Sequence, residues 1–207
     1  MFTKVLQNIM LNVSLNMEMM KDHKISSSKR SPKVNALIII DIQEKIIRPI
    51  FNKDSIIKNI KKLINAYQIL EENIFISEQN PLKLGETIPE LLPKARFKKI
   101  EKMVFSLANI QDFLNELKNK KISNLIVCGI ETHICIQQTA LDCLQKGFEV
   151  ILISDAMGSR NKVDHEIALQ RMNQSGAILT TTESIIFELC KTADREEFKE
   201  IRNIIMS

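Results

Sequence analysis

Three residues with reactive side chains, Asp41, Lys102 and Cys135, each stand at or just after the end of an apolar segment of the sequence. A cysteine thiolate can attack an electrophilic carbon, and a neighbouring carboxylate can take up the proton and return it, first as general base and then as general acid. A lysine ammonium beside them would stabilise the thiolate and orient the carboxylate. Taken singly, Asp41 could cap a turn, Lys102 could be a solvated surface residue and Cys135 could be a buried packing residue. The chemistry is coherent only if the fold brings all three together.

The segment around Cys135 predicts a nucleophile held at a turn between a strand and a helix. Residues 124–130 are an apolar run that stops at Gly129, and apolar residues return at helical spacing from Thr132 until Gly147. The first N–H groups of such a helix lack partners, and the helix dipole favours negative charge there. We therefore expect the pKa of the Cys135 thiol to be lowered, and the backbone N–H groups of the turn to stabilise an oxyanion.

Apolar runs and helical patterns alternate along the chain. Strands are expected at residues 34–42, 73–77, 97–102, 124–130, 149–154 and 177–182. Helices are expected at residues 54–72, 109–119, 132–146, 162–175, 184–190 and 194–205. This alternation predicts an α/β fold, a three-layer, doubly wound, mostly parallel sheet of about six strands with helices on both faces. Ligands of such sheets bind at the carboxyl ends of the strands, where the three reactive side chains would meet.

The sequence between the second and third expected strands is dense in Pro, Gly and other turn residues. Residues 78–93 predict a long ordered loop at the carboxyl end of a strand, a position that often carries binding residues. No G-x-G-x-x-G motif follows the first strand and the sequence has no P-loop. A dinucleotide or nucleotide-phosphate site therefore lacks its main support.

Composition and charge restrict the class of protein. At 207 residues, with 44% hydrophobic and 26% charged residues, the chain is expected to form one globular domain. Residues 1–33 carry six Lys or Arg and two acidic residues, so they account for the whole net charge of +4. Because the remaining residues are neutral as a set, no basic surface for nucleic acid is expected on the folded part.

The expected location is the cytoplasm, with no membrane contact. No apolar run approaches the ~20 residues of a membrane span, and the four cysteines lack the dense spacing of a disulfide framework. Residues 1–33 contain a polar, Ser-rich and basic stretch and no signal-peptide core. We expect them to be a disordered extension or the product of a misassigned upstream start, and residues 34–207 to form the domain.

The motif GIETHICIQQTA, together with a strand ending in DIQ, resembles the isochorismatase-like cysteine hydrolase superfamily. The segments SEQNPLKLGETIPEL and EKMVFS resemble the branch of isochorismatase-domain proteins, and the resemblance runs from about Val34 to Phe198. It implies a parallel sheet wrapped by helices and a triad in which Asp41 is the base, Lys102 its partner and Cys135 the nucleophile. It also implies self-association into a homo-oligomer and a cis peptide bond at Ile130–Glu131, a strained geometry for a residue other than proline.

Departures from the family patterns narrow the expected function. Relatives that hydrolyse nicotinamide hold a metal through an Asp and His residues after the second strand, and that loop has no His here, so no metal and no cofactor are expected. True isochorismatases cleave a vinyl ether without a cysteine nucleophile. The presence of Cys135 points instead to a small amide-like or nitrile-like substrate and a thioester or thioimidate intermediate.

Four further residues, Gln43, Ile130, Glu131 and Thr132, are expected to contact the substrate or the oxyanion at the rim of the pocket. Two rival interpretations stay open. The fold could serve a non-catalytic scaffold or binding protein with an inert pocket, or it could hydrolyse an isochorismate-like ether without using the cysteine.

Overall fold

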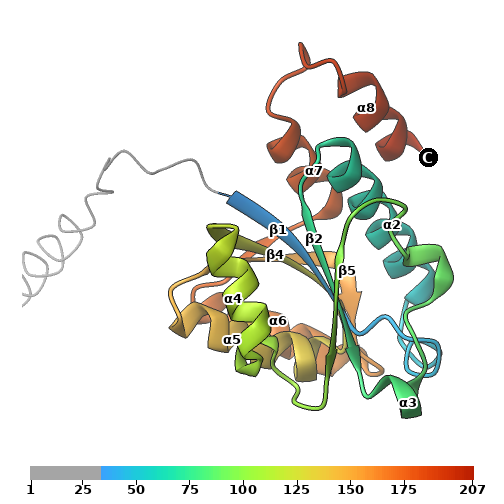
Figure 1. Ribbon diagram of the computed structural model, residues 1–207. Coiled ribbons are helices and arrows are strands. Elements are labelled where there is room, and N and C mark those ends of the chain that lie inside the picture. The colour runs from blue at the N-terminus through green and yellow to red at the C-terminus, as the bar shows by residue number, and fades with distance from the viewer. Residues whose placement is uncertain (1–33) are drawn as a thin grey trace, which may run out of the picture. The chain divides into compact units, whose positions relative to one another are not determined.

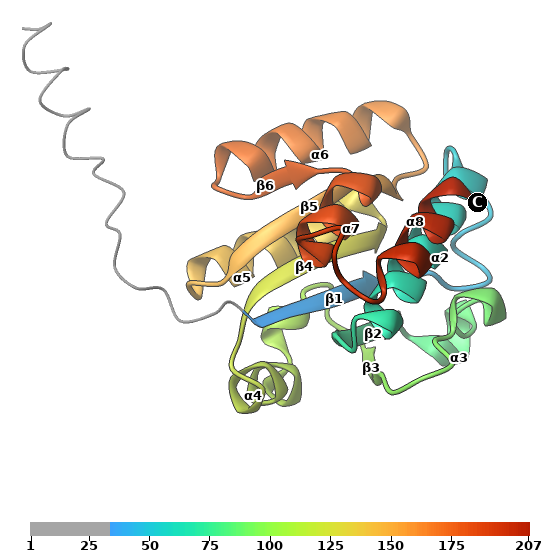
Figure 2. The same cartoon turned by 90° about the horizontal axis from the view of Figure 1, so that it is seen from above.

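The computed structural model describes residues 34–207, and the expectations for residues 1–33 lie outside this described part of the chain (Figure 1). One parallel sheet has the strand order β3-β2-β1-β4-β5-β6, which confirms the predicted α/β class (Figures 1 and 2). The strands are β1 (Val34–Ile40), β2 (Asn73–Gln79), β3 (Lys98–Lys102), β4 (Ile122–Ile130), β5 (Glu149–Gly158) and β6 (Ile178–Thr180).

Helices cover both faces of the sheet and give the three layers that the alternation predicts (Figures 1 and 2). One face is covered by α2 (Lys53–Ile69), α7 (Thr182–Cys190) and α8 (Phe198–Met206). The other face is covered by α4 (Gln111–Asn119), α5 (Gln137–Gln145) and α6 (Lys162–Gln174). Shorter helical turns are α3 (Pro81–Leu84), Pro89–Leu91, Leu107–Asn109 and the π-type turn Thr132–Ile136.

The central strand β1 shows why this sequence forms a sheet covered on both sides. Its side chains alternate, so that Leu37 and Ile39 pack under α2 while Ile38 and Ile40 pack under α4 and α5, and all four are buried. A strand with both faces buried has a continuous apolar run as its sequence, which is the pattern here.

Among the helices of residues 34–207, none has the length and apolar character that a membrane span requires.

Gly129 lets β4 lie close to the end of β1. Its φ is +120°, and a Cβ atom at this position would be 2.1 Å from the carbonyl oxygen of Ile40. Only glycine fits such a contact with the backbone. This close approach sets β4, and the turn that follows it, against the residue after Ile40, which is Asp41.

Several boundaries differ from the sequence-based predictions, and two of these differences have a visible structural cause. Strand β5 continues to Gly158 rather than ending at residue 154, because a register shift between Val127 and Gly129 lets β4 pair again with Met157 and Gly158. Helix α2 starts at Lys53, behind Asn52 in a left-handed conformation, and not behind a side-chain cap at residue 54 or 55. Residue types alone do not reveal a bulge or a backbone cap.

Candidate active site

Lys102 and Asp41 form a buried ion pair at the carboxyl edge of the sheet. The distance between Lys102 Nζ and Asp41 Oδ2 is 2.6 Å, and both side chains are shielded from solvent. They come from β3 and from the end of β1, which flank β2 in the sheet. The ion pair therefore spans the end of β2, as the carboxyl-edge argument predicts.

Two polar side chains at the end of β2 form hydrogen bonds with this ion pair. Ser77 Oγ donates a hydrogen bond to Asp41 Oδ1 at 2.7 Å, and Lys102 Nζ donates one to Gln79 Oε1 at 2.8 Å. Residues 77 and 79 lie two apart on a strand, so both side chains face the same side of the sheet. As a result each carboxylate oxygen of Asp41 has a donor, and the ammonium of Lys102 has two acceptors.

The backbone of Asp41 is held in the left-handed region, with φ at 53°. Its N–H donates to the carbonyl oxygen of Ser77 at 3.1 Å, so the residue stays attached to β2 after β1 has ended. Aspartate tolerates this conformation better than most residues with a side chain. The turn aims the carboxylate across the end of β2 at Lys102.

Cys135 lies in the π-type turn Thr132–Ile136 between β4 and α5, where only 7% of the residue is exposed. The carbonyl oxygen of Glu131 accepts hydrogen bonds from the N–H groups of Ile134 and Ile136 at 3.1 and 3.3 Å, which closes the turn around the thiol. The side chains of both Asp41 and Lys102 act on the pKa of the thiol, which places them beside it. The peptide bond Ile130–Glu131 is cis. The structure thus places the three predicted side chains close together at the carboxyl edge of the sheet.

The prediction of a lowered thiol pKa is wrong. Burial, followed by the negative charge of Asp41, raises the pKa of Cys135 to about 12, and Lys102 only partly opposes them. Without substrate the thiol is therefore protonated at neutral pH. Deprotonation of the thiol at neutral pH would therefore need a base beside the sulfur, and Asp41 is a carboxylate close to it.

Gln43 is not at the rim of a pocket, which corrects another prediction. The residue is fully buried, its Nε2 donates to the carbonyl oxygens of Gln79 and Gly85 at 3.0 and 2.6 Å, and its Oε1 accepts from the N–H of Gln79 at 2.7 Å. Every polar atom of the amide is occupied by backbone. Gln43 therefore anchors β2 to the loop that follows it and indirectly positions Gln79.

The other three predicted contacts lie around the turn. The Oε2 of Glu131 accepts from the backbone N–H and the Nε of Arg160 at 3.0 and 3.2 Å, and Thr132 Oγ1 is hydrogen-bonded to His165 Nδ1 at 2.9 Å. Ile130 is buried at the end of β4. Their side chains thus hold the turn, and a role for the backbone N–H groups of residues 130–132 at an oxyanion stays a prediction.

Sequence reasoning missed Ser77 and Gln79 as members of the site. A signal was present, because both end the second apolar run and would face the same edge as Asp41. Arg160 and His165 had no comparable signal, since they reach the turn from the loop after β5 and from α6 through tertiary packing. Within residues 34–207 no three His, Cys, Asp or Glu residues gather as a metal site.

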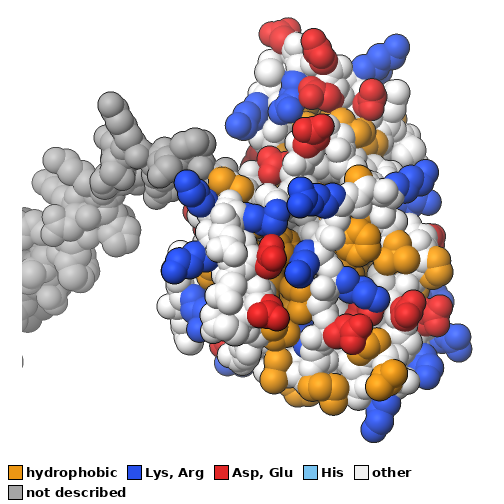
Figure 3. Space-filling view, in the orientation of Figure 1, with side chains coloured by type: hydrophobic (Ala, Val, Ile, Leu, Met, Phe, Trp, Pro, Cys, Tyr) orange, Lys and Arg blue, Asp and Glu red, His pale blue; other side chains and the backbone are white. Residues whose placement is uncertain are grey.

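The loop after Lys102 exposes three apolar side chains beside the site. Met103, Val104 and Phe105 are 71%, 44% and 50% exposed, and Leu82 on α3 is 97% exposed. Figure 3 shows apolar side chains at the lower edge of the view, over α3 and the loop after β3. The carboxyl edge of the sheet therefore combines the buried side chains of Asp41, Lys102 and Cys135 with an apolar surface.

Comparison with known proteins identifies the family. The Isochorismatase domain profile matches residues 35–184. The chain is 40% identical to Isochorismatase family protein 1B of Dictyostelium discoideum over 182 residues, which cover 85% of this chain and 88% of that protein. It is 38% identical to Isochorismatase domain-containing protein 2 of Xenopus laevis over 180 residues, 86% of each chain.

A solved structure described as MAR1 ribonuclease from Caenorhabditis elegans superposes with a TM-score of 0.80 at 37% identity, over 86% of this chain and 92% of that one. Sequence and fold therefore agree in their assignment. The chain belongs to the isochorismatase domain family.

Proposed function

We propose that this protein is a hydrolase that uses Cys135 as a covalent nucleophile on a small amide-like substrate, without a metal or other cofactor. The observation that carries the proposal is the buried Asp41–Lys102 pair, whose charges both act on the Cys135 thiol beside it. A buried ion pair is seldom a net source of stability, so its presence beside a thiol favours a chemical role over a structural one.

The chemistry follows from the protonation state of the thiol. When an amide carbonyl lies against the sulfur, Asp41 takes the thiol proton as the S–C bond forms, and the protonated carboxyl then gives that proton to the leaving nitrogen as the C–N bond breaks. The product is a thioester on Cys135. Asp41 then takes a proton from water as the water oxygen attacks the thioester carbon. The C–S bond breaks, the carboxylic acid leaves, and Asp41 returns the proton to the sulfur.

Lys102 and the turn supply electrostatic stabilisation. The ammonium of Lys102 keeps a positive charge next to the sulfur throughout, which stabilises negative charge on sulfur while it attacks. Backbone N–H groups of residues 130–132 are assigned to the oxyanion, because their turn holds the sulfur. With a nitrile, the sulfur adds to the nitrile carbon and Asp41 passes the thiol proton to the nitrogen, which gives a thioimidate without a leaving group. Attack of water on the thioimidate then expels ammonia and leaves the thioester.

The test is ammonia release from a panel of small amides and nitriles. Wild-type protein should release ammonia from at least one of them, and Cys135→Ala and Asp41→Asn should each lose about 10³-fold or more in kcat. Cys190→Ala is the matched control, since Cys190 is a buried cysteine on α7 outside the site. No turnover of any panel member, with a folded protein, would favour the scaffold interpretation.

Two other outcomes select other functions. Turnover of isochorismate that survives in Cys135→Ala but is lost in Asp41→Asn would indicate cysteine-independent ether hydrolysis. The name of the Caenorhabditis elegans structure makes RNA cleavage a second candidate. A fluorescent RNA oligonucleotide cleaved by wild type and spared by Lys102→Met would support it.

We also propose a cytoplasmic homo-oligomer. All four cysteines are free thiols and buried, which suits a reducing compartment. The exposed residues Met103, Val104 and Phe105 offer apolar surface for contact with a second copy. Light scattering after size exclusion should show an oligomer that Phe105→Ser weakens, and a monomer in wild type would contradict this.

A further inference from the structure

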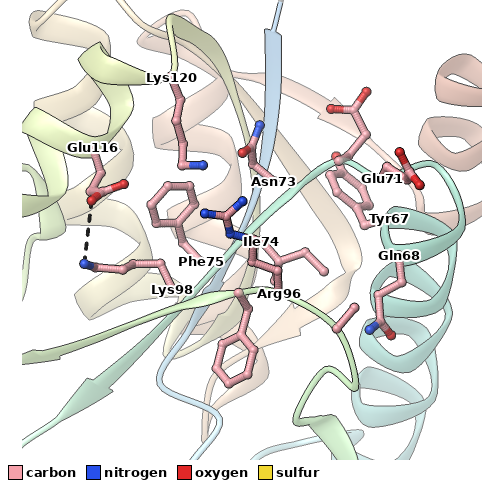
Figure 4. Close-up of a pocket in the computed structure, with 13 residues that line it drawn as sticks. Tyr67, Gln68, Glu71, Asn73, Ile74, Phe75, Arg96, Lys98, Glu116 and Lys120 are labelled. Atoms are coloured by element: carbon pink, nitrogen blue, oxygen red, sulfur yellow. Dashed lines mark ion pairs between the residues drawn. The ribbon is translucent and has the colours of Figure 1, made fainter.

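A pocket of about 610 Å³ lies at the amino ends of β2 and β3, at the edge of the sheet opposite the Asp41–Lys102 pair (Figure 4). Its volume falls within the ~300–1,000 Å³ typical of small-molecule sites. Apolar side chains of Ile74, Phe75 and Phe97 line part of it. None of the triad residues does, so this pocket is independent of the proposed function.

Two cations of this pocket have no acidic partner among residues 34–207. Figure 4 shows Arg96, Lys98 and Lys120 on the side of the pocket formed by β3 and α4. Lys98 Nζ lies 3.6 Å from Glu116 Oε1, whereas the side chains of Arg96 and Lys120 form no ion pair or hydrogen bond within the described part of the chain. This side of the pocket therefore carries unbalanced positive charge.

The acidic residues of the pocket do not cancel this charge. Glu116 is already paired with Lys98. The pKa of Glu72 is raised overall, because burial outweighs the opposing effect of Lys191 and Arg195 nearby. Glu71 comes from the end of α2, on the other side of the pocket (Figure 4). An anion at the β3 and α4 side would thus meet attraction with little opposition.

The pocket also holds an unused hydrogen-bonding group. Tyr67 is fully buried and lines the pocket, and its hydroxyl has no hydrogen-bond partner among residues 34–207. Buried hydroxyls are normally paired, and an unpaired one in a native fold calls for a ligand or a water. Burial, followed by Glu72 and Cys128, raises the pKa of Tyr67, so the hydroxyl keeps its proton and can donate it.

The loop that carries Arg96 is held in place. With its amide oxygen facing the loop, Gln68 on α2 accepts hydrogen bonds from the backbone N–H groups of Lys94 and Ala95 at 3.0 and 2.6 Å. A cation on an anchored loop loses less conformational freedom when it binds a ligand than one on a free loop.

We propose that this pocket binds a small organic anion, a carboxylate on an apolar body. Arg96 and Lys120 bind the carboxylate, the apolar body packs on Ile74 and Phe97, and the Tyr67 hydroxyl donates to an oxygen of the ligand. The two requirements, charge and apolar surface, distinguish this site from a surface that attracts any anion.

The test is calorimetric titration of benzoate and hexanoate into the full-length protein. Benzyl alcohol serves as the neutral comparison and inorganic phosphate as the anion without an apolar body. At least one carboxylate should saturate a single site, and Arg96→Ala and Lys120→Ala should each raise its Kd about tenfold. Lys118→Ala, an exposed lysine on the same helix α4, should leave the Kd unchanged.

Two further variants separate this site from the rest of the protein. Tyr67→Phe removes only the unpaired hydroxyl, so the Kd should rise about threefold or more while the melting temperature does not fall. Alkylation of Cys135 should leave the Kd unchanged. Four results would each overturn the proposal: no saturable binding of either carboxylate, equal binding of phosphate or benzyl alcohol, unchanged affinity in both cation variants, or loss of binding after alkylation.

Discussion

Lys102 Nζ and Asp41 Oδ2 lie 2.6 Å apart although their strands are not neighbours in the sheet. The strand β2 between them pairs Ser77 with Ile40 on one side and Gln79 with Lys102 on the other. The register of these two parallel strand pairs, and not proximity in the sequence, therefore sets the contact. The ion pair forms only when this edge of the sheet is folded.

Replacing Lys102 by Met should be costly to stability as well as to activity. The variant leaves the Asp41 carboxylate buried without its counter-ion, and breaking a buried pair in this way costs about 3–5 kcal/mol. Urea unfolding measures this free energy. Lys98→Met is the control on the same strand: its partly exposed contact with Glu116 should be worth under about 1 kcal/mol. Equal losses in the two variants would contradict a buried, functional pair.

Ser77→Ala tests the support of the carboxylate. Ser77 is a positioning residue, since its hydroxyl donates to Asp41 Oδ1 at 2.7 Å. Loss of a bond to a charged, buried acceptor should cost about 1–3 kcal/mol and lower kcat about tenfold with little change in KM. Ser154→Ala removes a hydroxyl that donates to the neutral carbonyl of Thr180 at 3.0 Å. If both variants retain full kcat, Asp41 does not depend on Ser77.

Gly129→Ala and Gly147→Ala form a matched pair of glycine substitutions. Both positions have positive φ, but a Cβ at Gly129 meets the backbone of Ile40 at 2.1 Å, whereas one at Gly147 meets nothing within 4 Å. Gly147→Ala should lower the free energy of unfolding only by about 1–2 kcal/mol, which is what a left-handed backbone conformation costs a residue with a Cβ atom. Gly129→Ala should cost more than about 4 kcal/mol or prevent folding. Thermal unfolding compares them, and similar melting temperatures would refute the close approach of β4 to β1.

Alkylation of Cys135 by iodoacetamide should be slow at pH 8. With a pKa of about 12, about one thiol in ten thousand is ionised at that pH, against about a quarter for a free thiol of pKa ~8.5. The rate should still rise about tenfold per pH unit above pH 9. Asp41→Asn should speed alkylation because it removes a charge that raises the thiol pKa, and Lys102→Met should slow it.

Peptide mapping by mass spectrometry assigns the alkylated cysteine. The thiol of Cys143, with a pKa also raised to about 12 but by burial and Asp142, should respond to neither variant. A plateau in the Cys135 rate below pH 9, or slower labelling in Asp41→Asn, would show that the thiol is ionised in the resting protein.

Much of the fold and the placement of Asp41, Lys102 and Cys135 could be predicted from the sequence because both follow from local patterns. Runs buried on both faces mark the strands, and the residues that end them must meet at one edge, which brings Asp41 and Lys102 together. The thiol pKa could not be predicted, since it depends on how deeply the turn is buried and on the distance to Asp41. The position of Gln43 could not be predicted either, because a polar side chain after a strand can face solvent or can be buried and bind the backbone.

The pocket at the opposite edge had no signature in the sequence. Tyr67 belongs to the apolar stripe of α2, where a pattern reads it as core. In the sequence, nothing distinguishes Arg96 and Lys120 from other cations expected at the surface. The three-dimensional arrangement shows that, within residues 34–207, the hydroxyl lacks a hydrogen-bond partner and that two cations without an ion pair line the same pocket.

The most direct test of the central claim is to look for a covalent bond at Cys135 during turnover. The protein is mixed with an amide that it hydrolyses, quenched in acid within one turnover, digested and mapped by mass spectrometry. The mechanism predicts the mass of the acyl group on the Cys135 peptide in wild type, and neither adduct nor ammonia release in Cys135→Ala. Full turnover in Cys135→Ala, with no adduct in wild type, would contradict a cysteine nucleophile.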